Sequence, residues 1–438
     1  MNSATARFDR RGILAGGLAA GASSLLLPGL AQAQAAPASF PRLTALLEKW
    51  VGPGKFPGIV AGVGLPGRDP QFVVRGTEGN GDTDPITPDS LFRIYSMTKP
   101  VTGVAAMMLV DEGKLGLDQP LSDILPKFAK MNVQVTPDGS VTDLRPARNP
   151  ILIRNLMTHT AGLGYSIIQR GPIKALMEER GVVAGQITKL PVPVPGFDRG
   201  KAVPSLALFA DRLADIPLVH EPGTTWSYSM GLDLLGRVIE VVSGRPFEVF
   251  LQERLFGPAG MTSTWFQVPA SEARRLTTNY VLAGQTFLPI DPSATSIYLD
   301  KPPFPFGGAG LVSTPRDYDR FLRMLAQYGR IDGRRLMSEP AVRVATSNLL
   351  PDGVDMKMMA MMGQGASGFG AGGRIGLGPE AGIFGWAGAA GTVGTVDMRR
   401  GIRSSIFLQF MPPNGLPVLT EYQQALQADL AALAARAA

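Results

Sequence analysis

Residues 92–103 have the sequence Phe92-Arg-Ile-Tyr-Ser96-Met-Thr-Lys99-Pro100-Val-Thr-Gly103, which places a serine hydroxyl and a lysine amine three positions apart. Proline is tolerated only in the first turn of a helix, so Pro100 predicts a helix that starts near Ser96. Residues three apart share one helix face, so the amine of Lys99 can reach the hydroxyl of Ser96. The free N–H groups of a helix start favour negative charge there. The spacing therefore indicates an activated serine nucleophile.

The residues after this motif indicate a helix, and other segments indicate strands. Apolar side chains recur at the spacing of an amphipathic helix with one buried face, at Val101, Val104, Ala105, Met108 and Leu109. Short apolar runs predict two strands before the motif and an antiparallel meander near the C-terminus, over 58–65, 71–75, 382–387, 392–398 and 404–410. The final stretch, 419–437, has helical periodicity and is expected to cover the sheet. Residues 170–204 are rich in proline and predict an extended surface excursion near the mouth of the site.

Two further motifs accompany the serine and the lysine. Glu221-Pro-Gly forms a predicted turn that leads to Tyr228-Ser-Met230, just before a second apolar helix. Later in the chain, Trp386-Ala-Gly388 ends a short predicted strand that runs into a glycine-rich turn. The order of the three motifs is more specific than any one of them, because a lone Ser-x-x-Lys pattern is short.

Taken together, these motifs resemble the serine β-lactamase and penicillin-recognising superfamily, and most closely the family VIII carboxylesterases. The resemblance runs from about residue 41 to about residue 420. It implies the α+β fold of the class C β-lactamases, in which helices flank an antiparallel sheet beside a mainly helical subdomain. The expected division is an α/β subdomain formed by 34–95 and 300–438, and a helical subdomain formed by 96–299.

The resemblance also implies a role for each motif. Ser96 would be the nucleophile, with Lys99 and Tyr228 as the other catalytic residues. The backbone N–H groups of Ser96 and Ala389 would form the oxyanion hole. Gly388 would let the strand approach the substrate without a Cβ in the way.

Two positions depart from the β-lactamase pattern. Met230 stands where those enzymes place an asparagine amide, and Trp386 stands where they place a cation. Neither side chain can pair with the carboxylate or the acylamido group of a penicillin. A site lined by Trp386, Met230 and Trp226 is expected to prefer neutral, partly apolar acyl groups, such as esters of short or medium acids.

The sequence therefore predicts a serine hydrolase, a carboxylesterase that forms an acyl-enzyme on Ser96. Whether Lys99 or Tyr228 is the general base is left open. The alternatives are a β-lactamase or D-Ala-D-Ala peptidase, an acyltransferase to an alcohol or amine, and a non-catalytic ligand sensor on the same fold. Retention of all three catalytic residues counts against the sensor.

The sequence lacks the residues that other classes of hydrolase need. The chain has no Gly-x-Ser-x-Gly elbow and no cysteine. Its two histidines, His159 and His220, are too few for an ordinary zinc site, so no metal or cofactor is expected. His159 lies in a segment that the resembling family also carries as a structural feature near the site, and His220 precedes a turn. We expect structural roles for both.

The amino terminus indicates export. Arg7, Arg10 and Arg11 precede the apolar run 12–30, and Ala31-Gln-Ala33 has the small-x-small pattern of a cleavage site. This pattern predicts a twin-arginine signal over residues 1–33, no stable membrane anchor, and a periplasmic or secreted protein. The net charge of +6 is modest and scattered, so nucleic acid is not expected as a partner. The expected partner is a small-molecule ester, and the oligomeric state is left open.

Overall fold

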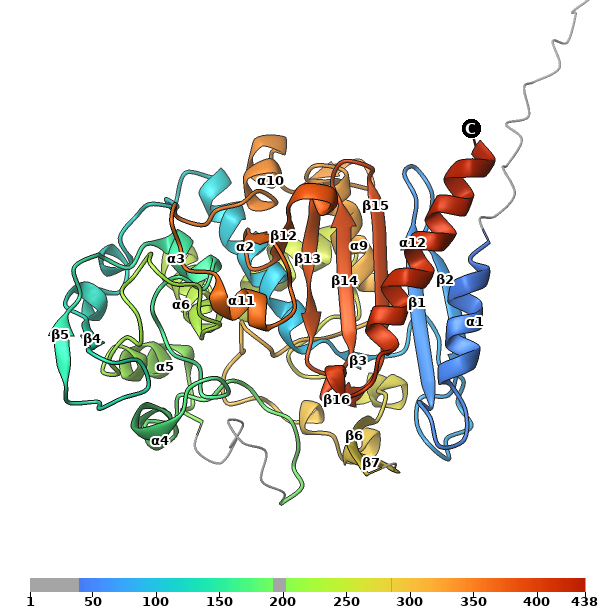
Figure 1. Ribbon diagram of the computed structural model, residues 1–438, viewed down its shortest axis with the longest axis horizontal. Coiled ribbons are helices and arrows are strands. Elements are labelled where there is room, and N and C mark those ends of the chain that lie inside the picture. The colour runs from blue at the N-terminus through green and yellow to red at the C-terminus, as the bar shows by residue number, and fades with distance from the viewer. Residues whose placement is uncertain (1–38, 192–201, 285, 438) are drawn as a thin grey trace, which may run out of the picture. The chain divides into compact units, whose positions relative to one another are not determined.

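The centre of the fold is a seven-stranded antiparallel sheet with the order β11-β12-β13-β14-β15-β1-β2 (Figure 1). The computed structural model describes residues 39–191, 202–284 and 286–437. The α+β class and the antiparallel meander predicted from the sequence are confirmed. The strands are β1 (Gly58–Gly64), β2 (Gln71–Gly76), β11 (Ser367–Phe369), β12 (Arg374–Gly376), β13 (Ile383–Gly388), β14 (Thr392–Asp397) and β15 (Ile402–Phe407).

The sheet joins segments from both ends of the described chain. Strand β1 pairs with β15, and Val60 lies opposite Phe407. Every residue of β1 is buried, as expected for a strand covered on both faces. Helix α9 (Pro315–Ala326) packs directly on the sheet. The packing is so close that a Cβ on Gly394 of β14 would lie 2.4 Å from the Tyr318 ring. The glycine therefore sets how closely helix and sheet approach.

Two helices from opposite ends of the described chain pack against each other. They are α1 (Pro41–Trp50) and α12 (Val418–Ala437), which lie side by side in Figure 1. The buried carboxylate of Asp429 accepts hydrogen bonds from the backbone N–H groups of Arg42 (3.1 Å) and Leu43 (3.0 Å). These N–H groups lie in the first turn of α1, where no intrahelical partner exists. The predicted C-terminal helix is confirmed, and it also caps α1.

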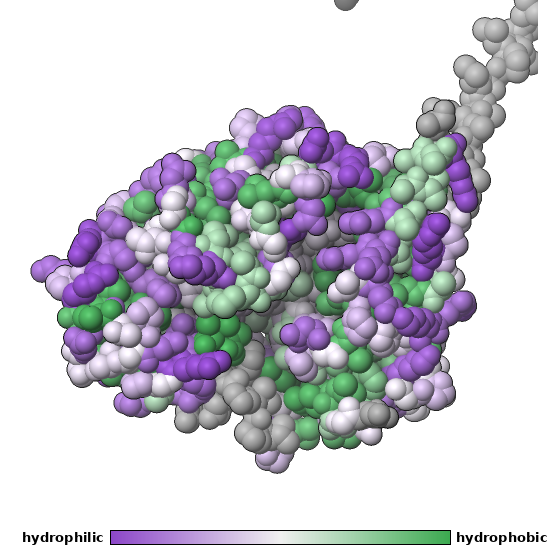
Figure 2. All heavy atoms as spheres, in the orientation of Figure 1, coloured by the Kyte–Doolittle hydropathy of each residue, from purple (hydrophilic) through white to green (hydrophobic). Residues whose placement is uncertain are grey.

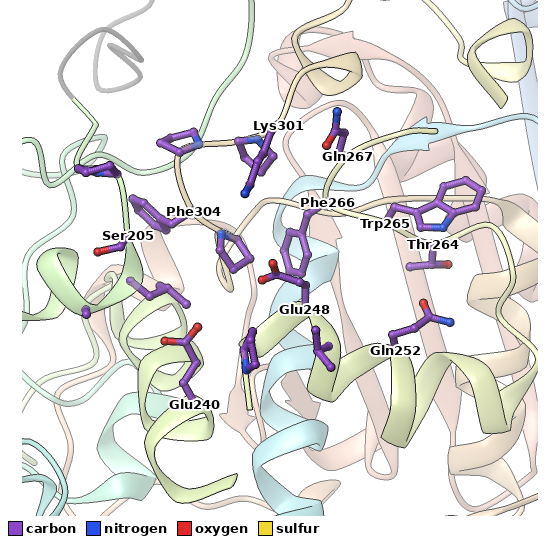
Figure 3. A pocket seen from close by; sticks show the side chains of 18 of the residues that line it. Ser205, Glu240, Glu248, Gln252, Thr264, Trp265, Phe266, Gln267, Lys301 and Phe304 are labelled. Carbon is purple, nitrogen blue, oxygen red and sulfur yellow. The ribbon is translucent and has the colours of Figure 1, made fainter. Parts of the chain in front are cut away.

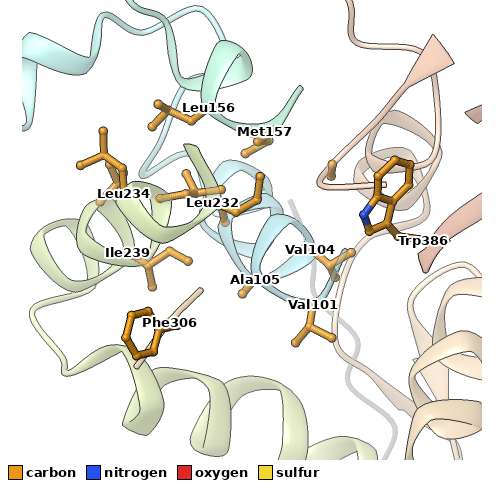
Figure 4. Close-up of a cluster of buried hydrophobic side chains, with 14 of the residues drawn as sticks. Val101, Val104, Ala105, Leu156, Met157, Leu232, Leu234, Ile239, Phe306 and Trp386 are labelled. Carbon is orange, nitrogen blue, oxygen red and sulfur yellow. The ribbon is translucent and has the colours of Figure 1, made fainter. Parts of the chain in front are cut away.

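Helix α2 (Thr98–Asp111) differs from the sequence prediction. We expected one buried face, but every residue from Thr98 to Leu109 is buried. The helix lies between elements on several sides, and a Cβ on Gly103 would lie 2.2 Å from the carbonyl oxygen of Ala371. Figure 4 shows Val104 of α2 toward Trp386 and Leu232 on the opposite side. A helix enclosed in this way is mostly apolar on every side, and its buried polar side chains, Lys99 and Thr102, are hydrogen-bonded.

Eight further α-helices belong to the described chain, and α6 and α10 among them pack against α2. Residues 170–204 do not form the extended excursion that we predicted, because Gly171–Glu179 is helical and the segment 182–187 is buried. The proline-rich core of that stretch, within 192–201, lies outside the described residues. These helices are α3 (Ile153–Met157), α4 (Gly171–Glu179), α5 (Leu206–Leu213), α6 (Gly231–Ser243), α7 (Phe247–Leu251), α8 (Gly257–Ala259), α10 (Glu339–Ala345) and α11 (Lys357–Met361).

Short strand pairs complete the fold. The β6–β7 hairpin lies at the lower edge of the view in Figure 2, where apolar residues gather; Leu288 of β7 is 47% exposed. The pairs are β3 (Phe92–Arg93) with β8 (Val312–Ser313), β4 (Asn132–Gln134) with β5 (Leu144–Pro146), β6 (Asn279–Ala283) with β7 (Thr286–Asp291) and β16 (Phe410–Met411), and β9 (Arg330–Ile331) with β10 (Arg334–Arg335).

Residues 39–438 form one compact unit. The predicted division into an α/β and a helical subdomain stays a prediction, and the predicted export signal, 1–33, lies outside the described residues. Within the described part of the chain, no helix is both long enough and apolar enough to span a bilayer.

Candidate active site

Ser96 lies at the junction of β3 and α2. The chain leaves β3 and makes a 3₁₀ turn, Tyr95–Met97, before α2 begins at Thr98. Tyr95 has a φ of +40°, which is uncommon for a residue with a side chain. Its hydroxyl accepts a hydrogen bond from the amide of Asn279 (3.2 Å). The turn leaves Ser96 half-buried while both of its neighbours are buried.

A buried arginine fixes the strand that leads to this turn. Arg93 is fully buried, and its guanidinium donates to the carboxylate of Asp291 (2.6 Å) and to the hydroxyl of Ser296 (2.9 Å). Its backbone N–H donates to the side-chain oxygen of Gln409 (3.1 Å). Buried charges persist when they are paired and hydrogen-bonded, as here. The network ties β3 to the β6–β7 region and to the segment after β15.

Lys99 contacts the nucleophile as the sequence predicts. Its Nζ donates to Ser96 Oγ at 3.2 Å and to the carbonyl oxygen of Gly308 at 2.8 Å. The same Nζ lies 4.5 Å from the centre of the Tyr228 ring and 5.4 Å from that of Tyr165. The amine is fully buried, so aromatic faces and a carbonyl replace water around it. This places a proton acceptor or donor directly against the serine hydroxyl.

Tyr228 is joined to the sheet by a hydrogen bond that the sequence did not predict. The indole N–H of Trp386 on β13 donates to the Tyr228 hydroxyl oxygen at 3.0 Å. We expected Trp386 to line the substrate site, and it is 7% exposed. The two residues are 158 positions apart, so no local pattern could reveal the bond. The structure thus brings Ser96, Lys99, Tyr228 and Trp386 together.

The predicted oxyanion donors lie on the two elements that meet at Ser96. Ala389 follows the last residue of β13 and is half-buried. A Cβ on Gly388 would lie 2.3 Å from the carbonyl oxygen of Ile94, so glycine is required where β13 approaches the segment before Ser96. This close approach brings the end of β13 beside the segment that leads to Ser96. The role of the Ala389 and Ser96 N–H groups in an oxyanion hole stays a prediction.

Trp226 and Met230 are fully buried, with no accessible surface. The Trp226 ring lies 6.1 Å from the Tyr228 ring, and Met230 precedes α6 as its N-cap. Trp226 therefore packs against the Tyr228 ring. Direct contact with a substrate stays a prediction for Trp226 and Met230.

His159 supports Tyr228 and does not contact Ser96. Its Nδ1 accepts from the backbone N–H of Ser229 at 3.2 Å, and its ring lies 4.7 Å from the Tyr228 ring. Burial, and then the charge of Lys99, lower the pKa of His159 well below 6.5, so the imidazole is neutral. These contacts agree with the expected structural role. His220 is half-buried in the loop before Glu221, and burial lowers its pKa as well.

Sequence reasoning missed a buried carboxylate next to this site. Asp233 lies in the first turn of α6, five residues after Tyr228, and accepts from the backbone N–H of Gly308 at 2.8 Å. Burial raises the pKa of Asp233 to about 6, against the opposing effects of the Lys99 charge and the Gly308 N–H. The available signal was an aspartate inside the apolar sequence Leu232-Asp-Leu-Leu.

A separate hollow of about 560 Å³ lies between α7 and the segment 301–305. Figure 3 shows Phe266, Phe304, Glu248 and Lys301 around it. None of the three catalytic candidates lines this hollow. Residues 301–305, which line it, precede Gly308 in the chain by a few positions.

Comparison with known proteins defines the class. The model of the beta-lactamase family matches residues 43–429, so the chain belongs to the beta-lactamase family. An uncharacterised protein of Mycobacterium tuberculosis is 39% identical over 321 residues, which cover 70% of this chain and 74% of that protein. Esterase EstB of Burkholderia gladioli is 31% identical over 212 residues, about half of each protein (48% and 47%).

The solved structures agree on the fold. EstCE1, described as a hydrolase with promiscuous acyltransferase activity, superposes with a TM-score of 0.70 at 24% identity and covers 88% of this chain and 97% of its own. The chain is therefore a member of a beta-lactamase-fold serine hydrolase family that has esterase and acyltransferase relatives.

Proposed function

We propose that the protein is an exported serine hydrolase that cleaves carboxylic esters of short to medium acyl chains through an acyl-enzyme on Ser96. The observation that carries this proposal is the 3.2 Å contact between Lys99 Nζ and Ser96 Oγ, with the lysine fully buried and the serine half-buried. An adjacent base is what a serine hydroxyl needs to become a nucleophile. A relative named as an esterase supports the same chemistry.

The reaction would proceed in two steps. Ser96 Oγ attacks the ester carbonyl carbon while its proton passes to Lys99 or Tyr228, and the N–H groups of Ser96 and Ala389 hold the oxyanion. Cleavage of the carbon–oxygen bond releases the alcohol, which takes up that proton. Water then attacks the acyl-enzyme, gives its proton to the same base, and releases the acid with regeneration of Ser96.

The position of Trp386 supports a neutral acyl group as substrate. Its indole N–H is donated to Tyr228, so this side chain offers neither a charge nor a free donor to a substrate carboxylate. Penicillins and stem peptides carry such a carboxylate, whereas simple esters do not. The site therefore favours simple esters.

Acylation of Ser96 is tested with p-nitrophenyl butyrate and intact-protein mass spectrometry. The wild-type protein should gain one butyryl group and release p-nitrophenol, whereas Ser96→Ala should do neither and should keep its melting temperature. Ser347→Ala changes an exposed serine and is the matched control, with wild-type turnover expected. Turnover by Ser96→Ala above a small fraction of wild type would refute the proposal.

Lys99 and Tyr228 are expected to act as one unit. Lys99→Ala and Tyr228→Phe should each reduce kcat by roughly 10³-fold or more, and the double variant should lose little more, because residues that share a proton path are strongly non-additive. Losses that multiply in the double variant would show separate roles.

A further inference from the structure

Asp233 is a buried carboxylate for which the mechanism above gives no role. Its side chain is fully buried, and Oδ1 accepts the N–H of Gly308 at 2.8 Å. Within the described residues, Oδ2 has no hydrogen-bond partner. A buried aspartate without a direct ion pair is rare, because removing a carboxylate from water is costly.

Gly308 lies between Asp233 and Lys99. Thr102 Oγ1 on α2 donates to the Gly307 carbonyl at 2.7 Å, and Asp233 on α6 accepts the Gly308 N–H, so one peptide group is held at both ends. The next carbonyl, that of Gly308, accepts from Lys99 Nζ at 2.8 Å. A Cβ on Gly308 would lie 2.5 Å from Asp233 Oδ2, so the arrangement requires glycine. The carboxylate thus fixes the carbonyl that holds the lysine.

The charge of Asp233 is not needed for this hydrogen bond. An asparagine could accept the same N–H of Gly308 with no charge to bury. Burial raises the pKa of Asp233 to about 6 against the opposing charge of Lys99, so the carboxylate is ionised at neutral pH when Lys99 carries its proton, although burial makes ionisation unfavourable. A carboxylate buried at this cost beside a reactive lysine is a candidate for a functional use of its charge.

We propose that Asp233 is a positioning residue that acts through Lys99, holding the amine by way of Gly308 and stabilising the ammonium that forms when Ser96 gives up its proton. The inference rests on the proposed acyl-enzyme function. In the acylation step the Ser96 O–H bond breaks, Oγ forms the bond to the acyl carbon, and the proton reaches Lys99 directly or through Tyr228. Lys99 then carries a positive charge opposite the negative charge of Asp233.

Few ionisable groups surround this pair. Lys99 faces Asp233 from α2, and Tyr165, in the loop after α3, interacts with the Asp233 charge. The Tyr228 ring lies 4.5 Å from Lys99 Nζ, and the neutral His159 packs against that ring at 4.7 Å. A pH profile that changes with Asp233 would therefore report this cluster.

Asp233→Asn is the decisive variant, because it keeps the shape and an acceptor for the Gly308 N–H. The rate of acylation by p-nitrophenyl butyrate should fall about 100-fold, the scale of losing one preorganised electrostatic group, while KM changes little. The acid limb of the kcat/KM profile should move to lower pH, because the site without the carboxylate holds protons less tightly. The melting temperature at pH 7 should stay equal or rise. An unchanged acylation rate and pH profile would overturn the inference.

The same substitution in a Lys99→Ala background separates a role through the lysine from a structural role. If Asp233 acts through Lys99, Asp233→Asn should cause no further loss of the slow residual acylation followed by mass spectrometry over hours. An equal fold-loss in both backgrounds would overturn the inference. Thr102→Val, which releases the other end of the same peptide group, should lower kcat in the Lys99 background and have no effect without Lys99.

A matched control is Asp317→Asn. Asp317 is also buried and accepts a backbone N–H, that of Ser263, but it lies at the start of α9 and contacts none of the catalytic residues. Its substitution should leave kcat and the pH profile unchanged. Failure of the wild-type protein to form an acyl-enzyme would refute the proposed function. An acylated wild type with an equally fast Asp233→Asn would refute only the role of Asp233.

Discussion

Trp386 shows what a sequence can and cannot say about a single residue. Its place in the Trp-Ala-Gly motif predicts that it lines the substrate site where β-lactamases place a cation, and this stays a prediction. The motif could not show that the indole N–H is donated to Tyr228 at 3.0 Å, because the partner lies in a distant segment and the bond depends on the complete fold. The Ser96–Lys99 contact was predictable, since it lies within one helical turn. Asp233 was missed for the same reason as the Trp386 bond, because its partner Gly308 is 75 positions away in the sequence.

Substrate class should change when Trp386 is replaced. In wild type, kcat/KM for p-nitrophenyl butyrate should far exceed that for a cephalosporin. Trp386→Lys should raise the relative rate on the cephalosporin, because a charge-assisted bond to its carboxylate contributes about 1.5–3 kcal/mol. It should also weaken ester turnover.

Trp386→Phe serves as the control for that experiment, since it removes the N–H and adds no charge. It should lower kcat for the ester by roughly threefold to tenfold through loss of one hydrogen bond to Tyr228, with the ester preference retained. A wild-type protein that prefers the cephalosporin would restore the β-lactamase reading.

For helices and strands, the spacing of apolar residues predicted where an element lies better than it predicted which of its faces are buried. The strands β1 and β2, the C-terminal meander and helix α12 were predicted close to their observed bounds. Helix α2 was also predicted, but its burial on every side was not. The spacing of large apolar residues identifies one buried face of a helix. A small residue such as Gly103 gives no such signal, and its burial depends on another element packing against it.

Gly103→Ala tests this close approach. The added methyl group would lie 2.2 Å from the Ala371 carbonyl oxygen, and backbone atoms on both sides cannot move aside easily. The free energy of unfolding should fall by about 1–3 kcal/mol although alanine is the better helix former. Thermal or urea denaturation measures the change. Gly116→Ala, where the nearest atom lies at 3.3 Å, is the control and should change stability by less than about 0.5 kcal/mol.

For the molecule as a whole, two buried ionisable groups should oppose each other as the pH falls. His159 has a folded pKa well below 6.5, so the unfolded chain takes up its proton first and stability falls below about pH 6.5. Asp233 has a folded pKa of about 6, above its usual 3.8, so the folded chain takes up that proton first and stability rises between pH 6 and pH 4. Each group changes the unfolding free energy by about 1.4 kcal/mol per pH unit in its window.

Urea denaturation of variants at several pH values separates the two effects. Asp233→Asn should unfold more steeply toward acid between pH 6 and pH 4 than wild type, because the compensating proton uptake is gone. His159→Gln should show the reverse, a shallower loss of stability below pH 6.5, even if its stability at pH 7 is lower. Parallel curves for all three proteins would contradict both assignments.

The pairing of β1 with β15 joins two strands that are far apart in the sequence. During synthesis, β1 emerges from the ribosome more than three hundred residues before its partner does, and it has to wait with an unpaired edge. Contacts of such long range also slow folding after release. The sheet therefore cannot be completed until β15 has been synthesised, and any truncation before Ile402 removes the strand that joins β1 and β2 to the rest of the sheet.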